Sequence, residues 1–103
     1  MADKKVVEIA KRYANAVKAL NPHSVVLYGS YVYGTPHEFS DIDIGVVFED
    51  FKGDWLETSA DLFGIASDID DRLEPVLFDT EQDRSGFVKD ILKRGIIIYS
   101  AEN

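Results

Sequence analysis

The segment from Val25 to Phe48 constrains the fold more than any other part of the chain. It reads VVLYGSYVYGTPHEFSDIDIGVVF. Its first four residues are β-branched, aliphatic and aromatic, which predicts a buried strand, and Gly29-Ser30 ends that strand abruptly. From Asp41 onward, charged and apolar residues alternate and begin a second strand that continues to Phe48. The segment therefore predicts a strand, a glycine turn, a short helix, a loop and a second strand.

Two aspartates stand at the start of the second strand. Because side chains alternate between the two faces of a strand, we expect Asp41 and Asp43 on the same face. Neighbouring carboxylates repel each other unless a cation lies between them. The pair is therefore a candidate site for a divalent metal ion.

The Gly29-Ser30 turn supplies a second functional feature. A strand that ends at such a turn and leads into a helix presents backbone N–H groups, which can bind phosphate. The short helix is predicted over residues 30–33, with Gly34 ending it and Thr35-Pro36 preventing its continuation. A phosphate-binding turn followed by a metal-binding pair suits a complex of a metal ion with a nucleoside triphosphate.

Two better-known motifs do not fit this segment. The spacing from Gly29 to Gly34 is that of a P-loop, but Thr35-Pro36 follows where Lys-Ser/Thr is required. A calcium-binding EF-hand loop starting at Asp41 would have a lysine at its twelfth position, where a glutamate ligand is needed.

The motif resembles the signature of the DNA polymerase β nucleotidyltransferase superfamily, and more narrowly that of the minimal nucleotidyltransferases (MNT proteins). The matching positions are Gly29, Ser30, Gly34, Ser40, Asp41 and Asp43. The resemblance implies an α/β fold of the α+β kind, in which a small mixed β-sheet is flanked by about four helices, as in the palm of polymerase β. It also implies transfer of a nucleoside monophosphate to a hydroxyl group, with release of pyrophosphate.

The resemblance assigns roles to particular residues. The nucleotide-binding residues would be Gly29, Ser30, Gly34 and Ser40, and the catalytic and metal-binding residues would be Asp41, Asp43 and Glu74. Two Mg²⁺ ions are expected, with ATP as substrate. The sequence departs from the family in two places: Glu74 stands where aspartate is usual, and Val32-Tyr33 occupy the short helix where many relatives carry arginine.

The remaining elements follow from helical and strand patterns. Asp3 can cap a helix that runs to about Leu20, and Asp54 can cap one that runs to about Arg72. The inward stripe of this later helix is expected to comprise Trp55, Ser59, Leu62, Phe63, Ala66, Ile69 and Leu73. Further elements are a strand over 74–78, a strand over 96–99, and between them a helix that starts at Thr80, is closed by Gly95 and carries Phe87, Val88, Ile91 and Leu92.

The order of elements also predicts their arrangement. The first two strands should be antiparallel neighbours, while the second and third should be parallel because a long helix joins them. That arrangement places Glu74 near Asp41 and Asp43.

Length and charge restrict the class of protein further. With 103 residues, the chain is expected to form one domain over 1–103, and its net charge of −8 argues against binding nucleic acid. No lysine or arginine lies between Lys18 and Lys52, so triphosphate charge would have to be met from elsewhere, for example by Lys18, Arg72 or Arg84. The N-terminus lacks the apolar core of a signal peptide, and no apolar run suggests a membrane span, which predicts a cytoplasmic protein.

Larger members of the superfamily carry a second domain that holds the acceptor, so this chain is expected to need a partner. The MNT resemblance implies a small helical HEPN-domain protein, the toxin of a toxin–antitoxin pair, to which the MNT protein transfers AMP. Two alternatives stay open: a non-catalytic antitoxin that acts by binding alone, and a subunit of a small-molecule nucleotidyltransferase of the aminoglycoside-modifying kind. Oligomerisation is also left open.

Overall fold

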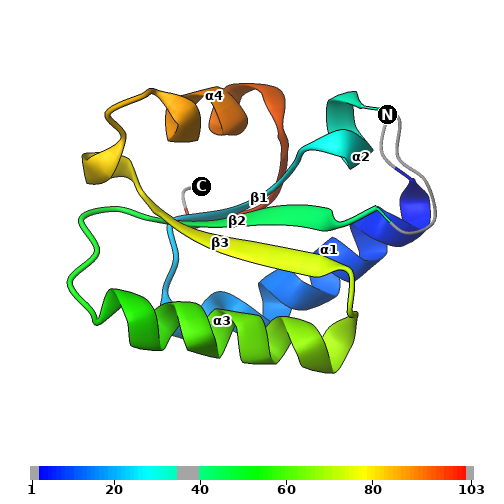
Figure 1. Cartoon of the computed structure of the whole chain (residues 1–103), viewed down its shortest axis with the longest axis horizontal. Helices are drawn as coiled ribbons and strands as arrows, with labels where there is room; N and C mark the ends of the chain where they lie inside the picture. The colour runs from blue at the N-terminus through cyan, green and yellow to red at the C-terminus, as the bar shows by residue number, and fades with distance from the viewer. Residues whose placement is uncertain (1–2, 35–39, 102–103) are drawn as a thin grey trace.

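The protein is a four-stranded mixed sheet with helices on both faces (Figure 1). This computed structural model describes residues 3–34 and 40–101. The strands are β1 (Ser24–Tyr28), β2 (Ile42–Phe48), β3 (Leu73–Asp79) and β4 (Ile96–Ser100), in the sheet order β3-β2-β1-β4. As predicted, β1 and β2 are antiparallel and β2 and β3 are parallel; β4 pairs antiparallel with β1.

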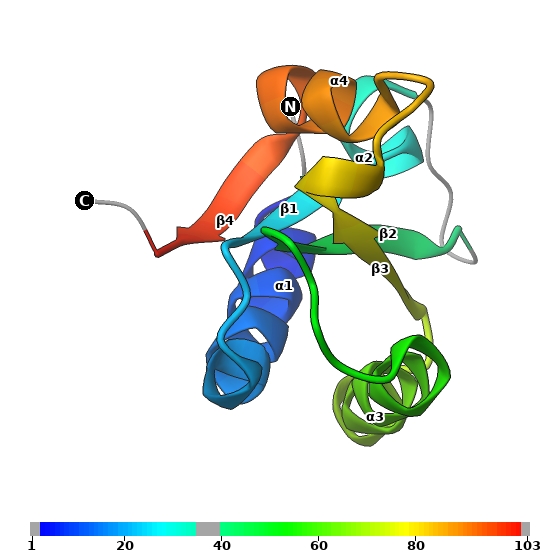
Figure 2. The same cartoon turned by 90° about the vertical axis from the view of Figure 1, so that its left-hand side faces the viewer.

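The described residues form six helical segments, two of which precede β1 while the other four lie between strands. They are α1 (Lys4–Val17), η1 (Lys18–Leu20), α2 (Ser30–Tyr33), α3 (Trp55–Ile69), η2 (Thr80–Gln82) and α4 (Phe87–Arg94), where η denotes a 3₁₀ turn. Helices α1 and α3 cover one face of the sheet, and α2, η2 and α4 lie on the other (Figures 1 and 2). The predicted α+β fold is therefore confirmed. In the described part of the chain, no helix combines the length and the apolar character that crossing a membrane would require.

The main core lies between the sheet and the α1–α3 layer. Alternate residues of β2, namely Ile42, Ile44 and Val46, are fully buried there. The hydroxyl of Tyr13 on α1 donates a buried hydrogen bond of 2.9 Å to the carbonyl of Leu62 on α3 and joins the two helices. A smaller core under α4 contains Val26, Val47 and Val88. Because strand side chains alternate, the residues between the core positions of β2 point to the α2–α4 face.

Two predicted helix boundaries are wrong. The first helical segment ends at Leu20 as predicted, with its last turn a 3₁₀ turn, but α3 ends at Ile69 rather than near Arg72. The last helix does not begin at Thr80: a 3₁₀ turn ends at Gln82, and α4 starts at Phe87. The side chain of Asp83 accepts hydrogen bonds of 2.9 Å from the amides of Val88 and Lys89, and this cap sets the later start.

The inward stripe predicted for α3 is only partly correct. Leu62 and Ala66 are buried, but Trp55 is 46% exposed and Phe63 is 54% exposed. Trp55 packs edge-to-face on the ring of Phe51 in the preceding loop instead of entering the core. Phe87, at the start of α4, is 45% exposed.

Candidate functional site

The candidate site is a row of three polar side chains that crosses the sheet. Tyr28 on β1 is the antiparallel partner of Asp43 on β2, and Asp43 is the parallel partner of Glu74 on β3. The neighbours of Asp43 in β2, Ile42 and Ile44, are buried in the main core, so Asp43 lies on the face that carries α2 and α4. The sequence prediction that Glu74 lies near Asp43 is thus matched by the strand register.

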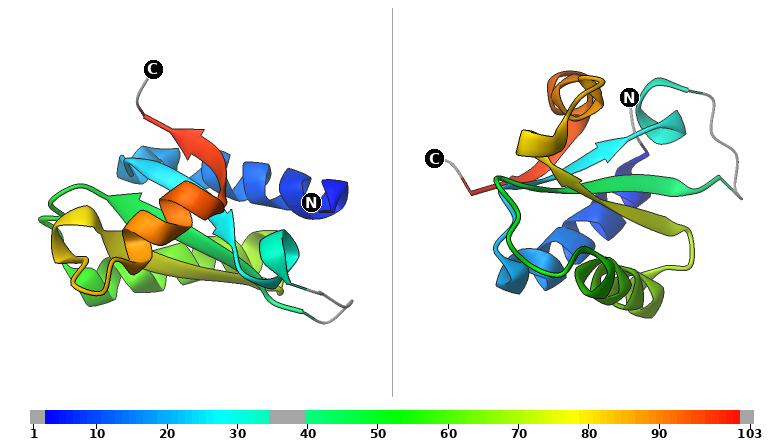
Figure 3. Two further views of the ribbon diagram at one scale, coloured as in Figure 1. Left: turned by 90° about the horizontal axis from the view of Figure 1, so that it is seen from above. Right: turned by 60° about the vertical axis from the view of Figure 1, so that its left-hand side comes forward.

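The row lies at an open edge of this face. Helices α2 and α4 leave the beginning of β3 uncovered when the sheet is viewed from their side (Figure 3, left). In agreement, Glu74 is exposed and Asp43 is half-buried. A substrate can therefore reach both carboxylates from solvent.

Gly29, in the turn predicted to bind phosphate, lies against this row. Its φ of +82° and ψ of −153° belong to a region of backbone conformation that only glycine adopts readily. A Cβ atom at this position would overlap Oδ2 of Asp43. The turn backbone is thus packed directly against the carboxylate, which places the predicted phosphate site and the predicted metal site side by side.

Ser30 begins α2, and Gly34 ends it. The carbonyl of Gly29 accepts hydrogen bonds from the amides of Val32 and Tyr33, and the carbonyl of Ser30 accepts one of 3.0 Å from the amide of Gly34. The first amide groups of a helix have no partner inside that helix, so they are available to a bound anion. Gly34 closes the short helix, because its amide donates to the carbonyl of Ser30.

Ser40 and Asp41 lie just before β2. The hydroxyl of Tyr31 on α2 donates a long hydrogen bond of 3.4 Å to the carbonyl of Ser40, and this contact holds the entry to β2 near the turn. Asp41 is exposed and precedes the first residue of the strand. The predicted helix stop at Thr35-Pro36 lies outside the described residues.

Electrostatics single out Asp43 among the three acids. Burial, followed by the charges of Asp41 and Glu74, raises the pKa of Asp43 above its usual range. Burial, with added effects of Asp43, Tyr33 and Glu74, raises the pKa of Tyr28 to about 12. Tyr28 therefore stays a neutral hydroxyl at neutral pH, and the site carries uncompensated negative charge.

This donor set fits a divalent cation. Carboxylate oxygens are the ligands that Mg²⁺ prefers, and a cation would relieve the repulsion that raises the pKa of Asp43. Among residues 3–34 and 40–101, however, no three His, Cys, Asp or Glu side chains lie close enough together to hold a metal ion without rearrangement. Asp41, Asp43 and Glu74 are thus brought near one another but do not form a closed cluster.

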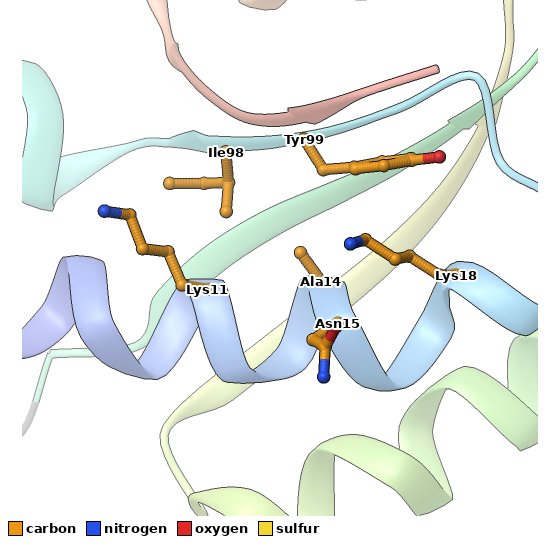
Figure 4. A pocket seen from close by; sticks show the side chains of 6 residues that line it. All are labelled: Lys11, Ala14, Asn15, Lys18, Ile98 and Tyr99. Carbon is orange, nitrogen blue, oxygen red and sulfur yellow. The ribbon is translucent and has the colours of Figure 1, made fainter.

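The three cations considered for the triphosphate differ in their placement. Lys18 lies on the opposite layer, in a hollow between α1 and β4, with its ammonium group 5.1 Å from the ring centre of Tyr99 (Figure 4). Arg84 is exposed in the turn before α4. Arg72 is the best placed because its carbonyl accepts a hydrogen bond of 2.7 Å from the amide of Ile42, at the entry to β2. Its guanidinium group is held by Asp70 at 3.2 Å.

Sequence reasoning missed two residues of this face. Arg94 on α4 lies 4.9 Å from the ring centre of Tyr33 on α2, so a guanidinium group does reach the short helix that lacks its own arginine. The sequence alone did not indicate that β4 pairs with β1. Because that pairing positions α4 above the turn, the contact of Arg94 could not be predicted without it. Tyr28 was treated as part of a strand, although its position directly before Gly29 was a signal that it borders the site.

An aromatic cluster extends the face beyond the carboxylates. The rings of Tyr28, Phe78 and Phe87 contact one another with centroid distances of 5.6 to 6.1 Å. Val76, between Glu74 and Phe78 on the same strand, is 40% exposed. The carboxylates are therefore bordered on one side by an apolar surface of β1, β3 and α4.

Comparisons with known proteins agree with this fold. A protein from Sulfolobus solfataricus, provisionally described as a nucleotidyltransferase, superposes with a TM-score of 0.71 at 22% identity, covering 96% of this chain and 84% of its own. A chain of the toxin–antitoxin complex MntA–HepT, crystallised with two aspartates replaced by glutamate, gives a TM-score of 0.58 at 20% identity, covering 99% and 76%. No curated protein sequence is significantly similar to the chain. The family model described as "Polymerase beta, Nucleotidyltransferase" matches residues 4–103, and the chain therefore belongs to the polymerase β nucleotidyltransferase family.

Proposed function

We propose that this protein is an Mg²⁺-dependent enzyme that transfers AMP from ATP to a hydroxyl group of a partner protein. The observation that carries the proposal is the packing of the Gly29 backbone against Asp43, in a row that continues to Glu74. A turn that binds phosphate and carboxylates that bind metal are the two parts that nucleotidyl transfer requires. Membership of the family supports the same general reaction.

Each residue has a defined task in this proposal. Asp41, Asp43 and Glu74 would hold two Mg²⁺ ions, which when bound neutralise phosphate charge and favour ionisation of the acceptor hydroxyl. The Gly29-Ser30 turn would bind the β- and γ-phosphates through its amide groups. Glu74, the exposed member of the row, would accept the proton of the acceptor hydroxyl.

The proposed reaction exchanges one phosphorus–oxygen bond of ATP for another. The acceptor oxygen forms a bond to the α-phosphorus of ATP, and the bond from that phosphorus to the bridging oxygen breaks. Pyrophosphate leaves from the turn, and AMP remains on the acceptor. Arg94, which contacts Tyr33 on this face, and Arg72, which lies at the entry to β2, would help to balance the charge of pyrophosphate.

Two observations favour a protein as the acceptor: the net charge of the chain and a solved structure with the same fold. A surface with a net charge of −8 is suited to a basic protein rather than to nucleic acid. A solved structure with the same fold comes from a toxin–antitoxin complex. We therefore propose a small helical protein of the HEPN class as the partner.

Radioactive ATP tests the transfer reaction. Incubation with Mg²⁺, host lysate and ATP labelled at the α-phosphate should label one small protein, whereas ATP labelled at the γ-phosphate should not. The variant Asp43→Asn is the matched control and should leave the protein unlabelled. Efficient transfer to an aminoglycoside by this chain alone would contradict a protein acceptor and support the small-molecule alternative.

One observation favours a second function, in which the protein acts by binding alone. Among the described residues the carboxylates do not form a closed metal cluster, and glutamate replaces the usual aspartate at position 74. Calorimetry with ATP separates the two functions, because an enzyme must bind ATP more tightly with Mg²⁺ than with EDTA. Equal affinity under both conditions would favour the binding function.

A further inference from the structure

Helix α3 exposes an uncharged stripe on the layer opposite the nucleotide site. Leu56 is 81% exposed and Phe63 is 54% exposed, and on a helical projection Ala60, Gly64 and Ser67 lie on the same side. A contiguous exposed apolar surface is a characteristic feature of sites at which proteins interact. Helices α1 and α3 lie side by side beneath the sheet, and the outer side of α3 faces away from the sheet (Figure 2).

A hollow lies beside this stripe, between α3 and the end of the first helical segment. Its volume is about 550 Å³, and it is lined by Leu20, Ala60, Asp61, Gly64, Ile65 and Asp68. The apolar part of the lining comes from Leu20, Ala60 and Ile65, while its two aspartates are seven residues apart in the sequence. Two helical turns separate them, which is about 10 Å along the helix axis.

Gly64 is a third, independent observation at the same place. Glycine destabilises the interior of a helix relative to alanine, so it needs a reason there. The folded chain gives none, because a Cβ atom at position 64 would meet no atom within 4 Å. Because the fold itself does not require glycine here, the missing side chain leaves room for another polypeptide chain to approach α3 closely.

We propose that this groove, formed by the hollow and the stripe of α3, binds a basic amphipathic helix of a partner protein. Apolar side chains of that helix would fill the hollow over Leu20 and Ile65 and pass close to Gly64. Lysine or arginine side chains two turns apart would pair with Asp61 and Asp68. Neither aspartate takes part in an ion pair within the described part of the chain.

A second copy of this chain is a poorer occupant. Its exposed basic face along α1 and η1 carries Lys11 and Lys18 with Asn15 between them, and these side chains cannot fill an apolar hollow. Two copies, each with a net charge of −8, also repel each other. The inference concerns a face remote from the Asp43–Glu74 row, and it does not depend on whether AMP is transferred.

A displayed helix library tests the groove directly. The probe is a helical peptide of about four heptads with leucine or alanine along one face and flanking positions that encode only lysine or glutamate. After selection on the intact protein, the enriched peptides should carry lysines seven positions apart. A fluorescent copy of the best peptide then gives affinities by anisotropy.

Three variants localise the binding. Gly64→Gln fills the hollow without disturbing the chain's own packing and should weaken binding at least tenfold, with an unchanged or higher melting temperature. Asp61→Asn combined with Asp68→Asn should weaken it at least threefold, and the loss should shrink at high salt. The matched control, Glu8→Gln with Glu49→Gln, changes the net charge equally at exposed positions outside the groove and should leave binding within twofold.

Other results would overturn the inference. Enrichment of glutamate-flanked peptides, or peptides that bind wild type and Gly64→Gln equally, would show that the groove is not the site. Sedimentation that finds a dimer of the wild type and a monomer of Gly64→Gln would identify a second copy as the occupant. The affinity of Gly64→Gln for ATP should equal that of the wild type. Failure of the groove proposal can then be distinguished from failure of the proposed AMP transfer.

Discussion

Asp43 and Glu74 are register partners on parallel strands, and within the described residues neither carboxylate forms an ion pair. Neighbouring strands are about 5 Å apart, so two like charges on adjacent partners of one face repel by about 1 kcal/mol in water. Partial burial strengthens that repulsion, and it contributes to the raised pKa of Asp43. The protein therefore carries an electrostatic cost at this row that a bound cation would remove.

Neutralising Asp43 should stabilise the protein in the absence of metal. We expect Asp43→Asn to raise the free energy of unfolding by about 1 kcal/mol, which for a domain of this size is a rise in melting temperature of roughly 4–8 °C. Mg²⁺ with ATP at a hundredfold excess over Kd should stabilise wild type by about 2.7 kcal/mol and Asp43→Asn hardly at all. Melting curves of both proteins, each in EDTA and in Mg-ATP, measure the four values.

The pH dependence of the stability difference between Asp43→Asn and wild type provides the control for this prediction. A carboxyl group whose pKa is raised by folding destabilises the folded state when ionised, and this cost disappears as the pH falls and the group is protonated. The difference between Asp43→Asn and wild type should therefore shrink between neutral pH and the acid range. A variant that melts below wild type in EDTA at pH 7, with equal gains from Mg-ATP, would mean that Asp43 is a structural residue.

The central part of the fold could be predicted because its determinants are local. The glycine turn ends β1, alternation defines β2, and a long helix between two strands makes them parallel, which fixes the pairing of Asp43 with Glu74. The position of β4 could not be read in the same way, because a short apolar strand pairs equally well with either edge of a sheet. The contact of Arg94 with Tyr33 depends on that position and was therefore missed.

The outer face of α3 shows why an apolar pattern alone is ambiguous. Apolar residues cover more than half of its circumference, but only some of them meet the core: Leu62 and Ala66 are buried there, and Ile65 and Ile69 pack against it partly buried. A sequence cannot tell which apolar residues meet the chain's own core and which meet a partner. Trp55 and Phe63 were therefore placed in the core although both are exposed.

Gly29→Ala should disrupt both the turn and the carboxylate. The backbone conformation at Gly29 costs about 1–3 kcal/mol for other residues, and the added methyl group would overlap Asp43. We expect destabilisation by about 2 kcal/mol or more and loss of Mg-ATP binding. Combining Gly29→Ala with Asp43→Ala removes the overlap but keeps the strained backbone, so a double-mutant cycle should give a favourable coupling energy. Additive effects would show that the turn and Asp43 are independent.

Asp79 is predicted to be a structural carboxylate that stabilises the sheet's other end. It is 5% exposed, and its oxygens accept hydrogen bonds of 2.9–3.0 Å from the amides of Asp50, Phe51 and Glu81. Removing a charged acceptor from buried donors costs several kcal/mol, so Asp79→Ala should lower the free energy of unfolding by about 3 kcal/mol. Asp79→Asn keeps one of the two acceptor oxygens and should cost less. Urea denaturation of the three proteins gives the order, and a loss below about 0.5 kcal/mol for Asp79→Ala would contradict this role.

Gly64→Ala should stabilise the isolated protein. The position lies in the middle of α3 with helical backbone and free space for a Cβ atom, so alanine gains helix propensity without a clash. The expected gain is about 0.5–1 kcal/mol, a few degrees in melting temperature. Ser67→Ala on the same exposed side is the matched control and should gain less, because serine is already a better helix former than glycine. If Gly64→Ala lowers the melting temperature, position 64 is constrained by its own chain. A gain in stability together with weaker binding of the basic helical probe would show that glycine is kept there at a cost to folding for the sake of a partner.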